Sequence, residues 1–383
     1  MGRHQPPRPL AAGDVVALYS EALGAWSASQ VTGIDAAAKC AAVLELDWSG
    51  PEPAAVADLG DVRPLRLTHH SWGGTLSYWN HGWVLPRSFT VIGSLLPLVT
   101  EPSGAYASVW GRGEQLARQR HWDSGDRGDW NAPHSLTCTA EELAAEHARG
   151  AVRSDVKHLT VRRITRLDCA RLVAVFPNLT RLSLSGNLGT LTSAAALNRL
   201  PRLQGLTIRE LFGMDAADCL LPRHVPEMEE VLLYGIPAGY AAAMRKAWRP
   251  QVRHGVQLDV HGARKPEWVA ASAANPLRDW GGREHIPRAG YRKAVAQYEA
   301  TRDAFLAEVT GGEHCGSIAE IGRAFAAAFN ALDSRSSFIE TVEREELFDA
   351  LDFLAEEAQT AAGRDLSAAR AALIEGVESS RDW

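Results

Sequence analysis

Three histidines and three tryptophans gather in one short segment, and imidazole beside aromatic rings can hold a metal ion or another ligand. The segment contains His69, His70, Trp72, Trp79, His81 and Trp83. No acidic or cysteine residue stands at a ligand-like spacing from these histidines. Packing of the rings is therefore the favoured interpretation, and a metal-dependent enzyme with its site within residues 69–129 is the alternative.

Two groups of carboxylates are the other candidates for chemistry. Asp123, Asp126 and Asp129 stand three residues apart, whereas calcium loops of the EF-hand type place oxygen ligands at every second residue and end in glutamate. This run is expected to be a solvated loop. A second group crowds one predicted helix, where no Glu-x-x-His motif of di-metal bundles occurs. That group is expected to be a solvated face or a surface for a basic partner, and it comprises Glu343, Glu345, Glu346, Asp349 and Asp352.

Motifs of catalysis and cofactor binding are missing from the sequence. It contains no nucleophile elbow, no P-loop, no dinucleotide-binding glycine motif and no zinc-protease motif. We therefore predict that the protein is not an enzyme and needs no cofactor and no metal.

Composition narrows the class of protein further. The chain has 383 residues and a formal net charge of -6, which disfavours a nucleic-acid partner. Its five cysteines are scattered, and it has neither a signal-peptide pattern nor an apolar run of about 20 residues. A cytoplasmic location without membrane contact is expected. Arginine greatly outnumbers lysine, which is typical of a bacterial genome rich in G and C.

The elements that would position these side chains follow from an internal repeat. An L-x-x-L-x-L skeleton recurs with its middle residue at Leu159, Leu182, Leu206 and Val231. A proline stands two residues before the first apolar position of successive units, at Pro177, Pro201, Pro226 and Pro250. Alternating apolar residues predict a short strand with one buried side, and helix-compatible segments lie between the strands. Each unit can bury its apolar side only against its neighbours.

This skeleton resembles the leucine-rich-repeat family. The resemblance implies an α/β horseshoe-shaped solenoid, which we expect over residues 41–262, with an irregular or inserted part at 71–131. Residues 1–40 are expected to form an N-terminal cap with a helix from about Asp14 to Trp26. Residues 263–383 show helical periodicity and are expected to form an acidic α-helical domain.

In such a solenoid the outward strand positions form a concave face that binds a protein partner. The skeleton assigns Gln257 to the position of Leu232, and it assigns Asp259 to that of Tyr234. The residues of this face predicted to bind a partner are His158, Arg162, Arg181, Ser183, Ser185, Thr207, Arg209, Glu230, Tyr234 and Asp259.

Charge differs between the two parts of the chain. Residues 262–383 hold 21 acidic and 14 basic side chains, a net charge of -7, which leaves the preceding part at +1. The main hypothesis is a protein–protein interaction scaffold that binds a partner of unknown identity through the concave face. The alternative is an immunity-protein-like or antitoxin-like inhibitor that covers a basic surface with its acidic helical tail.

Overall fold

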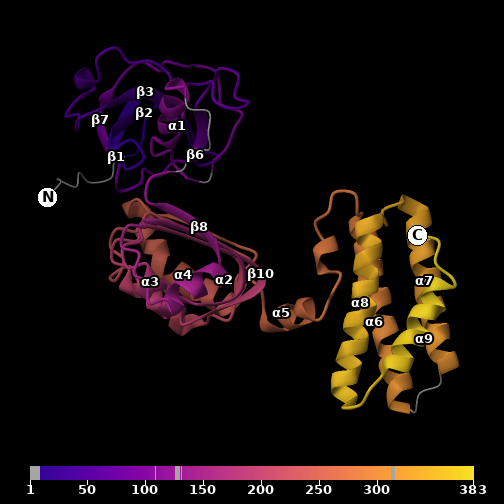
Figure 1. Cartoon of the computed structure of the whole chain (residues 1–383). Helices are drawn as coiled ribbons and strands as arrows, with labels where there is room; N and C mark the ends of the chain where they lie inside the picture. Colours follow the sequence, from indigo (N-terminus) through magenta and orange to yellow (C-terminus); the bar gives the residue numbers. More distant parts are fainter. Residues whose placement is uncertain (1–8, 108, 126–129, 131, 312–314) are drawn as a thin grey trace. The chain divides into compact units, whose positions relative to one another are not determined.

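The computed structural model describes the whole chain apart from residues 1–8, 108, 126–129, 131 and 312–314. The chain divides into two compact units, Met1–Pro266 and Glu267–Trp383. The first unit contains one antiparallel sheet, a two-stranded sheet and one parallel sheet, and the second is helical (Figure 1).

The antiparallel sheet has five strands in the order β6-β3-β2-β1-β7. Both of its faces are apolar, because Val16 and Leu18 of β1 belong to one buried cluster and Val15 and Ala17 to another. A short helix, α1 (Glu114–Asp123), follows this sheet in the chain. The strands are β1 (Asp14–Ser20), β2 (Ala25–Asp35), β3 (Cys40–Gly50), β6 (Tyr78–Gly82) and β7 (Thr90–Ser94), and the separate two-stranded sheet pairs β4 (Arg66–Leu67) with β5 (Thr75–Leu76).

The helix predicted from Asp14 to Trp26 is wrong. These residues form β1, a turn and the start of β2, and the two strands pair antiparallel. Apolar residues that suit one face of a helix instead fill both faces of β1, which also pairs with β7. This long-range pairing overrides the local preference.

The parallel sheet has six strands in chain order, from β8 to β13. Leu159, Leu182, Leu206 and Val231 lie opposite one another in neighbouring strands and are all buried. The strands are β8 (Ser135–Thr139), β9 (His158–Asp168), β10 (Arg181–Thr192), β11 (Gly205–Phe212), β12 (Glu230–Tyr234) and β13 (Gln257–His261).

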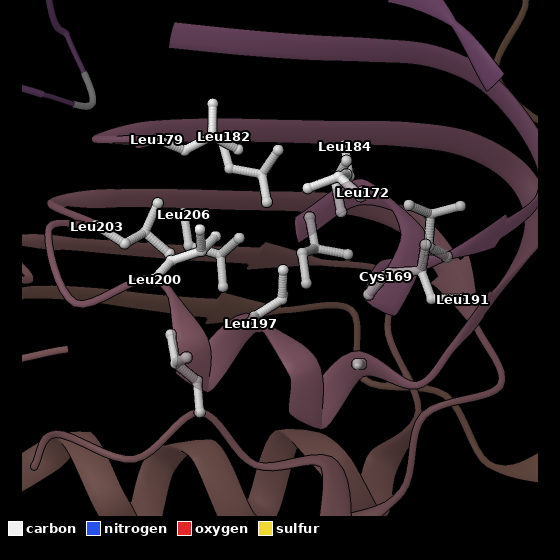
Figure 2. Packing of buried hydrophobic residues seen from close by; sticks show 14 of the residues in the cluster. Cys169, Leu172, Leu179, Leu182, Leu184, Leu191, Leu197, Leu200, Leu203 and Leu206 are labelled. Atoms are coloured by element: carbon white, nitrogen blue, oxygen red, sulfur yellow. The ribbon is translucent and has the colours of Figure 1, made fainter. Parts of the chain in front are cut away.

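Short helical connectors cover the apolar face of this sheet. Leu172 of α3 and Leu197 of η2 belong to the same buried cluster as the strand leucines, and Figure 2 shows them converging. The other face of the parallel sheet is left to polar side chains. The connectors are α2 (Ala140–Ala148), α3 (Cys169–Val175), η2 (Ala194–Arg199), η3 (Ala216–Asp218), α4 (Ala238–Trp248) and η4 (Arg249–His254).

The predicted leucine-rich-repeat horseshoe is wrong as the fold of this chain. Leu44 and Leu46 lie in a strand of the antiparallel sheet, and Leu67 lies in the two-stranded sheet. The chain therefore combines an antiparallel sheet, a small sheet, one parallel sheet and a helical region, and the described residues of 41–262 do not form one solenoid. The alternation of apolar residues shows that a strand has a buried side, but not which strand it pairs with.

The predicted register of the last strand is also wrong, by two residues. Gln257 lies opposite Glu230, and Asp259 lies opposite Leu232, so His261 takes the position beside Tyr234. The extra residues are accommodated by η4 and by Gly255, whose φ of 85° suits glycine.

The second unit packs four long helices around one apolar core, and they lie side by side in Figure 1. They are α6 (Arg288–Gly311), α7 (Cys315–Ser336), α8 (Thr341–Ala362) and α9 (Ser367–Glu378), preceded by α5 (Pro266–Ala273) and η5 (Arg278–Trp280). In the part of the chain that the structure describes, no helix is both long and apolar enough to cross a membrane.

Two glycines allow α7 and α9 to cross closely. A Cβ atom on Gly322 would lie 2.2 Å from the carbonyl oxygen of Leu373, and one on Gly376 would lie 2.1 Å from that of Ala319. Gly376→Ala gains about 1 kcal/mol of helix propensity. We expect this gain to be outweighed, because forcing packed backbones apart typically costs about 1–3 kcal/mol.

Hydrogen exchange on the full chain should therefore show faster exchange in α7 and α9 of the Gly376→Ala variant. Gly316→Ala is the matched control, since nothing lies within 4 Å of its new methyl group. Unchanged exchange in Gly376→Ala would contradict the close crossing.

Candidate functional site

The polar face of the parallel sheet, called the open face below, consists of three rows of side chains that run across the strands. Its rows alternate with the buried apolar residues because successive side chains of a strand point to opposite faces. The first row contains Ser135, His158, Arg181, Gly205, Glu230 and Gln257; the second contains Thr137, Thr160, Ser183, Thr207, Leu232 and Asp259; and the third contains Thr139, Arg162, Ser185, Arg209, Tyr234 and His261.

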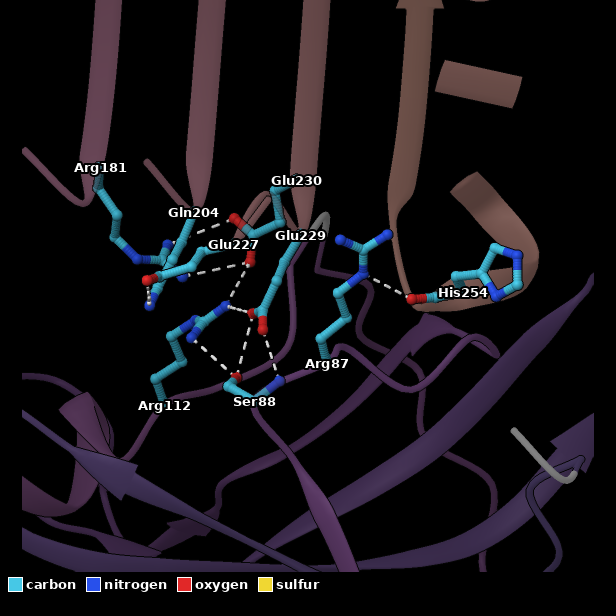
Figure 3. A network of polar contacts seen from close by, with 9 residues as sticks. All are labelled: Arg87, Ser88, Arg112, Arg181, Gln204, Glu227, Glu229, Glu230 and His254. Carbon is cyan, nitrogen blue, oxygen red and sulfur yellow. Dashed lines mark hydrogen bonds and ion pairs between the residues drawn. The ribbon is translucent and has the colours of Figure 1, made fainter. Parts of the chain in front are cut away.

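The first row is engaged in a buried ion network (Figure 3). The guanidinium of Arg112 pairs with Glu229 and lies 3.4 Å from Glu230, and both carboxylates are almost fully buried. Glu230 also accepts a hydrogen bond of 3.2 Å from Arg181. Ser88 donates its hydroxyl to Glu229 at 3.1 Å. Arg181 and Glu230, predicted to bind a partner, therefore already bind each other.

A second contact joins the same two parts of the first unit. Arg87 donates hydrogen bonds to the carbonyl oxygens of His254 (2.7 Å) and Pro226 (2.8 Å) and to the side-chain oxygen of Gln251 (2.8 Å). Neither this residue nor Arg112 was identified from the sequence. The only sequence signal was the consecutive pair Glu229 and Glu230 at the start of an apolar strand, where two carboxylates need partners.

A pocket of about 360 Å³ lies between the first two rows of the open face and α1. Its walls carry charged and aromatic side chains, and its floor carries hydroxyl groups. The lining includes Glu114, Arg118, Trp130, Ser135, His158, Thr160, Arg181, Ser183, Gly205, Thr207 and Glu230. Five residues of the predicted partner-binding set, His158, Arg181, Ser183, Thr207 and Glu230, thus surround one cavity.

His158 is held between two partners beside this pocket. Its Nδ1 atom lies 3.3 Å from the hydroxyl of Ser135, and its Nε2 atom lies 3.6 Å from the carboxylate of Glu21. Lys157 pairs with the same carboxylate at 2.8 Å. Burial lowers the pKa of His158, and the positive charge of Arg181 lowers it further, against smaller opposing effects of Glu21 and Glu114. Its surroundings therefore favour the neutral imidazole.

The third row holds the exposed part of the open face. The guanidinium of Arg209 lies over the ring of Tyr234, 4.5 Å from its centroid, and that ring is nearly parallel to the imidazole of His261. Asp259 of the second row lies 3.1 Å from His261. Arg162 and Arg209 are both exposed, and Ser185 of β10 lies opposite Arg209, where the register between β9 and β10 shifts. Burial raises the pKa of Tyr234, so its hydroxyl stays protonated.

The histidines of the segment 69–83 separate into two places. His69 and His70 approach each other with their Nδ1 atoms 3.1 Å apart, and the ring of His70 stacks on Trp122. His81 is buried elsewhere and stacks on Trp110. Among the residues that the structure describes, no three His, Cys, Asp or Glu side chains are placed to hold a metal ion.

The carboxylates of the predicted acidic loop fall partly outside the described residues. Asp126 and Asp129 lie there, whereas Asp123 accepts a hydrogen bond of 2.8 Å from Gln119. This bond ties Asp123 to its own helix, α1.

The carboxylates of α8 have different environments. Glu343 is buried beside Arg283 and His285, and Glu346 accepts a hydrogen bond of 2.8 Å from the indole of Trp280. Glu345 and Asp349 are exposed. Part of the acidic group thus belongs to the packing of the second unit.

The open face has two chemically different parts. One is the pocket beside α1, and the other is the exposed third row with its two arginines.

Comparisons of the chain with protein-family models, with curated proteins and with solved structures found no match.

Proposed function

We propose that the protein is a non-enzymatic binding module whose third row of the open face binds an acidic segment of a protein partner. The observation that carries the proposal is the state of Arg162 and Arg209. Both side chains are exposed, and neither forms an ion pair with any residue that the structure describes.

Arginine suits this role because its planar guanidinium binds a carboxylate through two parallel hydrogen bonds. The ring of Tyr234 supports the guanidinium of Arg209, so less side-chain entropy is lost when a ligand binds. Arginine and tyrosine are also the residue types that most often dominate binding energy. Each arginine also has a small side chain opposite it on a neighbouring strand, Ser185 for Arg209 and Thr139 for Arg162.

The spacing of the two arginines defines what the partner must present. Arg162 is on β9 and Arg209 on β11, and strands in a sheet lie about 4.8 Å apart. Two carboxylates about 10 Å apart would therefore be engaged together.

A cytoplasmic location belongs to the same proposal. It is supported by the cysteines, since Cys40, Cys138, Cys169 and Cys219 are all free thiols, as is usual in a reducing compartment.

The test begins with a partner captured by the wild-type chain and then purified. Its dissociation constant should rise at least 100-fold for the double variant Arg162→Glu/Arg209→Glu, because each charge reversal removes an anchor and adds repulsion. Isothermal titration calorimetry measures the change. Arg202→Glu is the control, since it reverses an exposed arginine in the turn before β11.

Equal affinity of the double variant and the wild type would show that the third row does not bind the partner. If instead Glu345→Lys/Asp349→Lys on α8 abolishes binding, the partner is basic and the inhibitor-like alternative holds. The two outcomes also differ in which partner surface must carry the opposite charge.

A further inference from the structure

The pocket beside α1 is a site distinct from the third row, and its size fits a small molecule. Its volume of about 360 Å³ is at the lower end of the range of about 300–1,000 Å³ for ligand sites. Its floor consists of the open-face side of β8 to β12, and its wall consists of α1 and Trp130. The second-row side chains of the floor, Thr160, Ser183 and Thr207, are small, and Gly205 of the first row has no side chain.

The charges around the pocket are of two kinds. Arg181 and Glu230 neutralise each other, since the guanidinium of Arg181 reaches across Gly205 to the carboxylate. Glu114 and Arg118 also line the pocket, but neither forms an ion pair with any residue that the structure describes. Four residues apart on α1, they lie on the same side of the helix, with their Cβ atoms about 6 Å apart.

This arrangement selects the charge of the ligand. A simple anion at Arg118 would face the carboxylate of Glu114, and a simple cation at Glu114 would face the guanidinium of Arg118. A neutral ligand would remove water from both charges and provide a partner for neither, which is unfavourable. A ligand with a positive and a negative group a few ångströms apart satisfies both.

We propose that this pocket binds a small zwitterion of the α-amino-acid class, with its ammonium group on Glu114 and its carboxylate on Arg118.

Further contacts favour the same ligand. The guanidinium of Arg118 lies over the ring of Trp130, 5.2 Å from its centroid, which fixes its position and leaves its N–H edge available for a carboxylate. Three hydroxyls of the second row, on Thr160, Ser183 and Thr207, stand side by side on the floor. They offer hydrogen bonds to the polar ends of the ligand.

This inference does not rest on the proposed partner binding, because it uses α1 and the first two rows of the open face. The test is ligand-observed saturation-transfer NMR on the full chain with the twenty L-α-amino acids as probes. Each probe has two matched controls, its Nα-acetyl derivative and its α-carboxamide, which remove the positive and the negative charge in turn. We expect at least one free amino acid to bind, and its two derivatives to bind at least 10-fold more weakly.

Two variants assign the charges to residues. Glu114→Gln should bind the free amino acid at least 10-fold more weakly than the wild type and should no longer distinguish it from the Nα-acetyl derivative. Arg118→Gln should lose the distinction from the α-carboxamide in the same way. Arg120→Gln is the control, because this exposed arginine of the same helix pairs with Asp47 outside the pocket.

The proposal is overturned if no amino acid binds at millimolar concentration, or if the Nα-acetyl derivative binds the wild type as well as its parent does. The double variant Arg162→Glu/Arg209→Glu should retain amino-acid binding. Loss of amino-acid binding in that variant would place the ligand on the third row and would equally contradict the proposed site in the pocket.

Discussion

Replacing Arg112 with methionine is expected to destabilise the chain by about 3–5 kcal/mol, the usual range when one partner of a buried ion pair is removed. The loss arises because Glu229 and Glu230 stay buried at 2% and 4% exposure after their shared guanidinium has gone. Arg181 still reaches Glu230, but the carboxylate of Glu229 keeps, among the described residues, only the hydrogen bonds from Ser88. Urea unfolding followed by tryptophan fluorescence measures the change.

Two comparisons identify the cause of the loss. Arg63→Met removes an arginine whose ion pair with Asp61 is 75% exposed on both sides, and its effect should stay within about 0.5 kcal/mol. The double variant Arg112→Met/Glu229→Gln should recover part of the stability, because it also removes the buried, unpaired charge of Glu229. A loss below about 1 kcal/mol for Arg112→Met would mean that the network does not hold the two sheets together.

Replacing Glu45 with glutamine is expected to stabilise the chain at pH 7 by about 3 kcal/mol. Burial, together with the smaller effect of the charge of Glu114, raises the pKa of Glu45 from 4.5 to about 7, against a hydrogen bond from Ser77. The unfolded chain ionises near pH 4.5, whereas the folded chain keeps this proton up to about pH 7. Stability contributed by Glu45 is therefore complete below pH 4.5 and is lost as the pH rises to 7, at about 1.4 kcal/mol per pKa unit.

His81 has the opposite pH dependence. Burial lowers its pKa from 6.5 to about 4, although a backbone hydrogen bond with Val109 and the charge of Glu230 oppose the shift. In the unfolded chain His81 is protonated below pH 6.5, whereas in the folded chain it is protonated only below about pH 4. Stability from His81 is therefore lost as the pH falls from 6.5 to 4. Between pH 4.5 and 6.5 the two residues offset each other.

Denaturation series between pH 4.5 and 7.5 separate the two groups. In the Glu45→Gln variant only the contribution of His81 remains of the two, so the free energy of unfolding of this variant should fall as the pH is lowered. The His81→Phe variant keeps a ring against Trp110 and retains the contribution of Glu45. Its free energy of unfolding should therefore fall as the pH is raised. Identical pH profiles for Glu45→Gln and the wild type would contradict the buried, protonated carboxyl group.

The sequence predicted some elements well because their signals are local. The alternation around Leu182 and Leu206 predicted strands with one buried side, and β10 and β11 lie there in register. Leu44 lies in the range 41–262 predicted for the solenoid, but its strand, β3, pairs antiparallel with β2. The direction in which a strand pairs leaves no mark on its own alternation, because an antiparallel and a parallel neighbour both leave one side of the strand to be buried.

By itself the sequence determined which side chains share a face of the parallel sheet. Arg162 and Arg209 each stand three residues after a buried strand leucine, Leu159 or Leu206, and alternation along the strand therefore places both on that face. Only the tertiary structure decided which charges there are free. Arg181 and Arg209 occupy equivalent-looking repeats, yet Arg181 is neutralised by Glu230 and Arg209 is exposed. The difference arises because Glu230 lies two strands away in the row of Arg181 and reaches it across Gly205, whereas Arg209 lies over the uncharged ring of Tyr234.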